Sequence, residues 1–167
     1  GLLFSVNEFR EYEWNPASYN VGGVFAEIMQ SKHASAQDKL RSLYLRMAKV
    51  PAYYASAKKM IKNPTIEHTD LGIQQNKGSL DVFRKMLMDS LQKTRMGAHE
   101  SQMIEARINE AVMAIEDYVS WLEKEIMPSL KTETARSFRI GKDLYEKKFQ
   151  FDIVSKFTAE DIYKKAL

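Results

Sequence analysis

Residues 98–127 read AHESQMIEARINEAVMAIEDYVSWLEKEIM, the longest stretch in which apolar residues recur with the period of an α-helix. The stripe continues for about eight turns. Its members are Ile104, Ile108, Ala111, Ile115, Tyr118, Leu122 and Ile126, and Val112, Val119 and Trp121 widen it. Because a helix that is apolar over so wide an arc must bury most of its surface, this helix is expected at the centre of a bundle.

Two further long helices are predicted before it. The segment 36–62 has an apolar stripe formed by Leu40, Leu43, Met47, Val50, Tyr54, Ala57 and Ile61. Pro51 lies inside this stripe and lacks a backbone donor, so a kink or a break between two collinear halves is expected. The segment 65–93 repeats apolar residues every seven positions, at Ile66, Ile73, Leu80 and Leu87. The three long helices predict an all-α fold, an irregular bundle of about six helices.

Shorter helices are predicted at both ends of the chain. The first covers residues 15–30, because Asn15 is a capping residue and Pro16 fits a first helical turn. Gly22 and Gly23 weaken this helix, so a neighbour is expected to pack closely against their bare backbone. Near the carboxyl end, a helix is predicted over 138–153, and a capping box at 158–161 begins another.

Composition limits the classes of function. The 167 residues carry 25 basic and 22 acidic side chains, a net charge of +3, which gives no electrostatic case for nucleic acid. No cysteine is present, so disulfides and thiolate metal sites are excluded. No apolar run reaches the roughly 18 residues that would span a membrane. One helical domain is expected over residues 1–167.

No catalytic or metal-binding motif is complete. The three histidines, His33, His68 and His99, lie far apart in the sequence, and only His99-Glu100 resembles the start of a helical zinc motif. Met103 occupies the second ligand position of that motif, and a thioether is a poor zinc ligand. Di-iron, phosphate-loop and serine-hydrolase motifs are also missing. We therefore assign no catalytic residue, no metal ligand and no cofactor to this chain.

A polar seam lies beside the apolar stripe of the segment 65–93. Its members are His68, Thr69, Gln75, Asn76 and Ser79, with Gly72 between them. In a bundle interior these groups need hydrogen-bond partners or a water-filled space. The favoured interpretation is a satisfied structural network. The alternative is the wall of a substrate channel, for which the candidate cleft-lining residues are His68, Thr69, Gln75 and Asn76.

Several short motifs, taken in order, resemble one known family. They are Glu13-Trp14-Asn15-Pro16, Tyr19-Asn20, Leu40 through Pro51, His68-Thr69, Gln75-Asn76-Lys77-Gly78, Phe138-Arg139-Ile140-Gly141, Leu144-Tyr145 and Lys148-Phe149. The set resembles the amino-terminal part of the bacterial family known as domain of unknown function 885. The resemblance implies a longer helical protein, often exported or lipid-anchored, that is similar to a zinc metallopeptidase of the gluzincin type. Its histidine-glutamate zinc segment would lie beyond this chain, so no catalytic residue is carried over.

The function that follows is a non-catalytic helical scaffold segment of such a peptidase, forming part of the wall of a substrate cleft. The resemblance admits zinc and a peptide substrate for the full-length parent, and suggests the envelope or periplasm. The alternative is a self-contained helical protein–protein interaction module. Both ends look cut, so the rest of the parent polypeptide is the expected partner, and a dimer is also compatible with the apolar surface that truncation would expose. Residues expected on that surface are Leu2, Leu3, Phe4, Phe149, Phe151 and Ile162.

Overall fold

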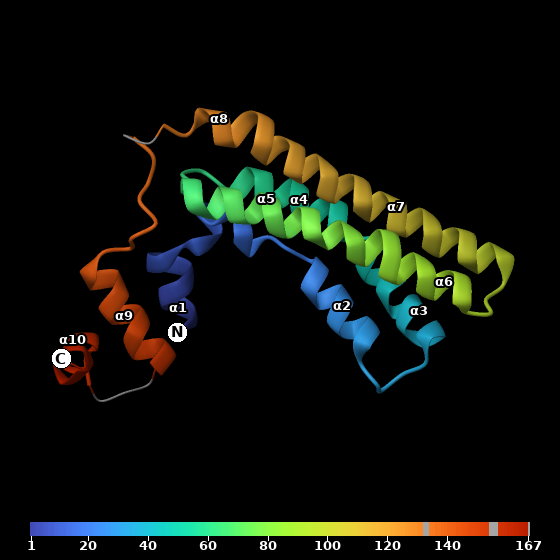
Figure 1. Ribbon diagram of the computed structural model, residues 1–167, viewed down its shortest axis with the longest axis horizontal. Coiled ribbons are helices and arrows are strands. Elements are labelled where there is room, and N and C mark those ends of the chain that lie inside the picture. Colours follow the sequence, from blue (N-terminus) through green and yellow to red (C-terminus); the bar gives the residue numbers. More distant parts are fainter. Residues whose placement is uncertain (132–133, 154–156, 167) are drawn as a thin grey trace.

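The computed structural model describes residues 1–131, 134–153 and 157–166, and the prediction of an all-α fold is confirmed. Within these ranges the only β-type pairing is an isolated bridge between Thr65 and Arg136. Within the same ranges, no helix is both long enough and apolar enough to cross a membrane. The fold therefore consists of packed helices, as Figure 1 shows.

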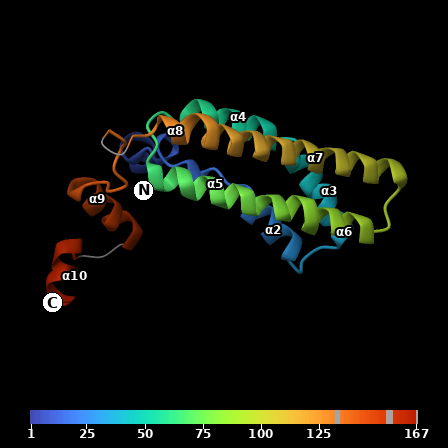
Figure 2. The same cartoon turned by 45° about the horizontal axis from the view of Figure 1, so that its top comes forward.

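The three long segments form the bundle. The first is divided into α3 (Ala36–Met47) and α4 (Val50–Met60), so the expected interruption lies directly before Pro51, which occupies the first turn of α4. The second runs through α5 (Ile66–Asp81), a π-helical turn at 82–87 and α6 (Met88–Lys93). The third runs through α7 (Ala98–Trp121), a second π-helical turn at 122–126 and α8 (Met127–Ser129). In Figures 1 and 2, the segment from α5 to α6 lies beside the segment from α7 to α8.

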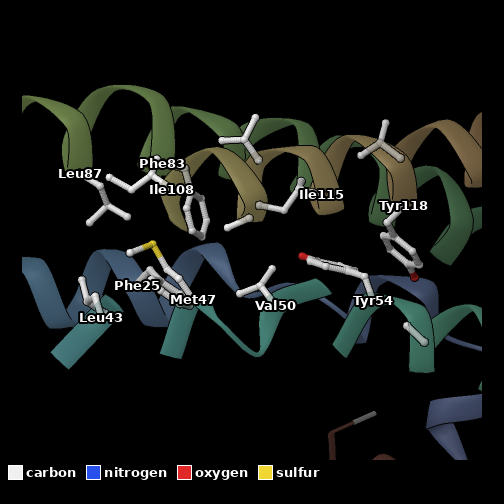
Figure 3. Packing of buried hydrophobic residues seen from close by; sticks show 14 of the residues in the cluster. Phe25, Leu43, Met47, Val50, Tyr54, Phe83, Leu87, Ile108, Ile115 and Tyr118 are labelled. Atoms are coloured by element: carbon white, nitrogen blue, oxygen red, sulfur yellow. The ribbon is translucent and has the colours of Figure 1, made fainter. Parts of the chain in front are cut away.

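The core lies between these helices. Leu43, Met47 and Tyr54 from α3 and α4 face Ile108, Ile115 and Tyr118 from α7, and all six are almost completely buried (Figure 3). Phe25 of α2 (Gly22–Gln30) closes one side by packing on Phe83, with ring centroids 5.0 Å apart. The predicted apolar stripes are therefore the faces that meet. Burial of each such side chain contributes about 1.5–3 kcal/mol to stability.

The predicted helix over residues 15–30 is wrong in its first half. Asn15 does cap a helical turn, because its side-chain oxygen accepts a hydrogen bond from the Ala17 amide, but that turn is a short 3₁₀ helix, Pro16–Ser18. The chain then leaves the helical conformation, and α2 begins only at Gly22. Two carbonyls of this region, those of Pro16 and Tyr19, accept hydrogen bonds from side chains of α7 and α5. We call residues 14–21 the strap.

The two ends of the described chain pack together beside the bundle. The aromatic residues Phe4, Phe9 and Trp14 form a small second core, against which Ile140 and Leu144 pack. The helices that meet here are α1 (Leu2–Phe4), a π-helical turn at 5–9 and α9 (Lys142–Ile153), with α10 (Ala159–Ala166) beyond them (Figure 1).

This arrangement corrects two predictions. Phe4 is buried against Phe9 and Phe151, not exposed, and Phe149 is only half-buried, whereas Leu2, Leu3, Phe151 and Ile162 are exposed as expected. The helix predicted from residue 138 begins at Lys142, because Gly141 has a φ of 84°, which no right-handed helix contains. The capping box at Thr158 is confirmed, since the hydroxyl of Thr158 accepts from the Asp161 amide and a carboxylate oxygen of Asp161 accepts from the Thr158 amide, both at 3.0 Å.

Acid is expected to loosen α10. Glu160 contacts Lys142 at 2.8 Å and Lys164 at 3.0 Å, and these ammonium groups lower the pKa of its carboxyl to about 2. The pKa of this carboxyl is lower in the folded state than the value of about 4.3 in the unfolded state. The stability that the ion pairs of Glu160 contribute is therefore complete above the unfolded-state pKa, and it is lost as the pH falls through the folded-state pKa. An NMR titration of the Glu160 carboxyl checks this, and Lys142→Gln should raise the midpoint. A midpoint of about 4.3 in the unmodified chain would contradict it.

Candidate functional site

The polar seam of α5 lies against the strap. Thr69 and Asn76 are completely buried and Ser79 is 5% exposed. Gly72 lies between them, and a Cβ atom placed on it would stand 3.1 Å from backbone atoms of Pro16 and Ala17. The absence of a side chain at position 72 is therefore what allows the strap to approach the helix backbone.

Asn76 is the centre of a hydrogen-bond network. Its Oδ1 accepts from the hydroxyl of Tyr54 at 2.6 Å, and its Nδ2 donates to the carbonyl of Tyr19 at 3.0 Å and to the carbonyl of Gly72 at 2.8 Å. The hydroxyl of Tyr118 donates to the Pro16 carbonyl at 3.0 Å. The network thus joins α4, α5 and α7 to a strap that is distant from all three in the sequence.

The tyrosines of this network remain neutral. Burial raises the pKa of both Tyr54 and Tyr118 far above the ordinary value for a phenol, because a phenolate would lose its hydration there. Their rings lie 4.9 Å apart between α4 and α7, and Figure 3 shows both between the helices. As neutral hydroxyls they donate, Tyr54 to the side chain of Asn76 and Tyr118 to the Pro16 carbonyl, but they supply neither a base nor a nucleophile at physiological pH.

A second set of bonds joins α5 to the start of α2. Asn20 Oδ1 accepts two hydrogen bonds, one from the Ser79 hydroxyl at 2.7 Å and one from the Gly22 amide at 2.9 Å. A Cβ atom on Gly22 would lie 2.3 Å from Ser79 Oγ, so α2 and α5 make backbone-close contact here. The expected close packing is confirmed for Gly22, whereas Gly23 has open space around it.

His68, a further member of the polar seam, lies at the amino end of α5. His68 is half-buried, its Nδ1 lies 2.7 Å from the Thr65 hydroxyl, and its ring packs edge-on against Trp14 at 5.4 Å. Because the same hydroxyl already accepts the His68 amide, its proton is free to point at Nδ1. The Arg136 guanidinium covers the Trp14 ring at 4.8 Å. His68 therefore helps to fix the first turn of α5 and the start of the strap.

Removal of the Thr65 hydroxyl tests this assignment. Thr65→Ala is expected to lower the free energy of unfolding by about 1 kcal/mol, because the His68 amide loses its cap. Thr65→Ser keeps the hydroxyl and should recover most of the loss. Urea unfolding of the two variants measures the difference. Equal stability of the Ala and Ser variants would mean that the cap contributes nothing.

The four candidate cleft-lining residues are thus in different surroundings. Thr69 and Asn76 are buried under the strap, His68 is half-buried at its edge, and Gln75 is exposed. Over the described residues, no buried side-chain nitrogen or oxygen lacks a hydrogen-bond partner. A role of these residues in lining a cleft stays a prediction. The partners Tyr54 and Tyr118 were not among the candidates, because both were counted as members of apolar stripes, although a buried tyrosine hydroxyl requires a partner.

No metal centre can be built from the described residues. Across them, no group of three or more His, Asp, Glu or Cys side chains could hold an ion. His33 and His99 are exposed. Glu100, beside His99, pairs with Arg41 at 2.6 Å and 3.1 Å through two hydrogen bonds, which lowers its pKa. His99 and Glu100 therefore lie in the first turn of α7, and Glu100 forms a surface ion pair with Arg41.

The fold and the seam define a helical bundle that is fastened by buried neutral hydrogen bonds. The chain belongs to the family described as bacterial protein of unknown function, DUF885, whose model matches residues 3–167. A solved structure titled "a putative lipoprotein of unknown function" from Shewanella oneidensis is similar, with a TM-score of 0.90 and 42% sequence identity. The similarity covers 98% of this chain but only 30% of that chain. No curated protein sequence matches.

Proposed function

We propose that this chain is a non-catalytic helical scaffold region of a longer bacterial envelope protein. The observation that carries the proposal is the mismatch in length: almost the whole chain matches 30% of a relative with the same fold. The seam supports it, because Asn76 and Ser79, two of its polar side chains, are bonded to the strap, and Asn76 is also bonded to Tyr54 of α4. A region built in this way positions other parts of a protein.

The longer protein is proposed to be a zinc metallopeptidase, with this region forming part of the wall of its substrate cleft. The support is the family resemblance stated above together with the membership of the family. The envelope location is supported by the description of the similar structure as a putative lipoprotein. Gln75 and His68 are the members of the seam that reach the surface, so α5 would face the cleft through them.

Zinc analysis of two purified proteins tests this proposal. The full-length polypeptide is expected to contain about one zinc per chain and to hydrolyse a peptide mixture such as digested casein. The 167-residue chain is expected to contain none. Stoichiometric zinc in the short chain would overturn the scaffold role, and a zinc-free full-length protein without hydrolysis would overturn the peptidase assignment. Gln75→Ala in the full-length enzyme should raise KM without changing the zinc content.

A protein–protein interaction module is the second candidate, and one feature favours it. An apolar hollow of about 390 Å³ lies between α3 and α7, lined by Arg41, Tyr44, Leu45, Glu100, Met103 and Ile104. Leu45 is 69% exposed there. Such a surface can accept the apolar side of a partner helix. A gene that encodes only these 167 residues would favour this candidate over the scaffold.

A further inference from the structure

Helices α9 and α10 leave their apolar side chains in solvent. Neither helix has a buried residue among those described. Leu144 and Phe149 are half-buried. Seven other large apolar residues on and around the two helices are between 41% and 65% exposed, and they are Phe138, Tyr145, Phe151, Ile153, Phe157, Ile162 and Tyr163. We call these seven residues the α9–α10 face. Large apolar side chains exposed in this number are typical of an interaction site.

The face also contains an unfilled hollow. Between the two helices lies a space of about 650 Å³, with an apolar lining formed by Tyr145, Ala159 and Tyr163. Charged residues surround it, and they are Lys142, Glu146, Glu160 and Lys164. α10 is held to α9 across this space by the Lys142–Glu160 ion pair and by the Ala159 amide, which donates to Glu146 at 3.3 Å. The rim holds two acids and two bases, so it does not select a strongly charged partner.

These helices are too short to be stable without further packing. α9 has 12 residues and α10 has 8, and isolated helices shorter than about 12–15 residues are marginal in water. The bundle helices are stabilised because each of them buries an apolar face. The apolar side chains of α10 are not buried. α9 is attached to the amino-terminal segment mainly through Phe151 on Phe4, Lys147 with Glu8, and Leu144. Burial against a further partner would therefore stabilise both helices.

We propose that the α9–α10 face is the docking site for helices from the remaining part of the same longer polypeptide. The inference rests on the proposed function, in which this chain is a region of that polypeptide. Most of the similar solved chain lies outside the matched region, so a large amount of protein is available to cover the face. A partner in the same chain has a high effective concentration, and apolar side chains from its helices would fill the hollow.

Hydrogen exchange compares the two forms directly. In the full-length polypeptide the amides of α9 and α10 are expected to exchange at least about 100-fold more slowly than in the short chain. Tyr163→Glu, which places a charge at the hollow, should remove most of this protection in the full-length protein. Met113→Glu is the matched control, because Met113 is similarly exposed but lies on α7. It should leave exchange in α9 and α10 unchanged.

Other occupants would overturn the proposal. Equal exchange in the two forms would show that the remaining polypeptide does not cover the face. Protection in the short chain that rises with its concentration would identify a second copy. Protection that appears only on vesicles of phosphatidylethanolamine and phosphatidylglycerol would identify a membrane surface. The measurement needs neither zinc nor activity, so failure of the peptidase assignment would leave the docking result readable.

Discussion

Asn76→Asp is expected to destabilise the protein by about 3 kcal/mol or more at neutral pH. The substitution keeps the shape of the side chain but removes the donor that bonds the carbonyls of Tyr19 and Gly72. It also places a carboxylate at a position with no solvent exposure and no cation among its hydrogen-bond partners. Both effects destabilise the folded state, because the carbonyl oxygens of Tyr19 and Gly72 would then face a buried negative charge.

The penalty should depend on pH. Burial raises the pKa of a carboxyl group, so the carboxyl that Asn76→Asp introduces would have a higher pKa in the folded state than in the unfolded state. The loss of stability that ionisation causes is therefore absent below the unfolded pKa of about 3.9 and grows as the pH rises through the folded pKa. Urea unfolding at neutral pH and at a pH close to the unfolded pKa measures it. The protonated form should recover part of the stability, because it regains one donor.

Gln75→Glu is the matched control for this variant. The chemical change is the same, amide to carboxylate, on the adjacent residue of α5, but Gln75 is exposed. A surface change of this kind is expected to alter stability by less than about 0.5 kcal/mol. If both variants lost the same amount, the buried network would not be what fastens the strap to the bundle.

Gly22→Ala and Gly23→Ala should change stability in opposite directions. At Gly22, the added methyl would lie 2.3 Å from Ser79 Oγ, 2.6 Å from its Cβ and 3.0 Å from its Cα. Rotation of the hydroxyl cannot move the last two atoms, so α2 and α5 must separate. Overpacking of this kind costs about 1–3 kcal/mol, which exceeds the gain in helix propensity of about 1 kcal/mol or less.

At Gly23 nothing lies within 4 Å of the added methyl. The propensity gain is then unopposed, and Gly23→Ala should stabilise the protein by about 0.5 kcal/mol. Thermal unfolding of the two variants, followed by circular dichroism, separates the cases. A stabilised Gly22→Ala variant would mean that the contact between α2 and Ser79 is looser than the structure has it.

The long helices could be predicted because their signal is local. Residues three and four apart share a helix face whatever else the chain does, and the stripe of α7 is buried along its length except at Ile126, which is half-buried. The interruption before Pro51 follows from the missing amide of proline. The break between Ser18 and Gly22 was not predictable in this way, because the strap's backbone groups bond to side chains far along the chain.

The meaning of the polar seam also depended on distant partners. The spacing of the seam on one helix showed that its polar side chains needed hydrogen-bond partners or water. The sequence left open whether they form a structural network or the wall of a substrate channel. The Tyr54 hydroxyl comes from 22 residues away, and Tyr118 bonds a carbonyl 102 residues away. No local pattern encodes such pairs, since they form only after the helices have packed.

The sequence by itself therefore determined the long helices and their apolar faces, because both depend on interactions within a few residues. The tertiary structure alone decided that Asn76, Tyr54 and Tyr118 form the network that holds the strap. Hydrogen bonds and burial depend on what lies nearby in space, and the partners in this network are 22, 57 and 102 residues apart in the sequence.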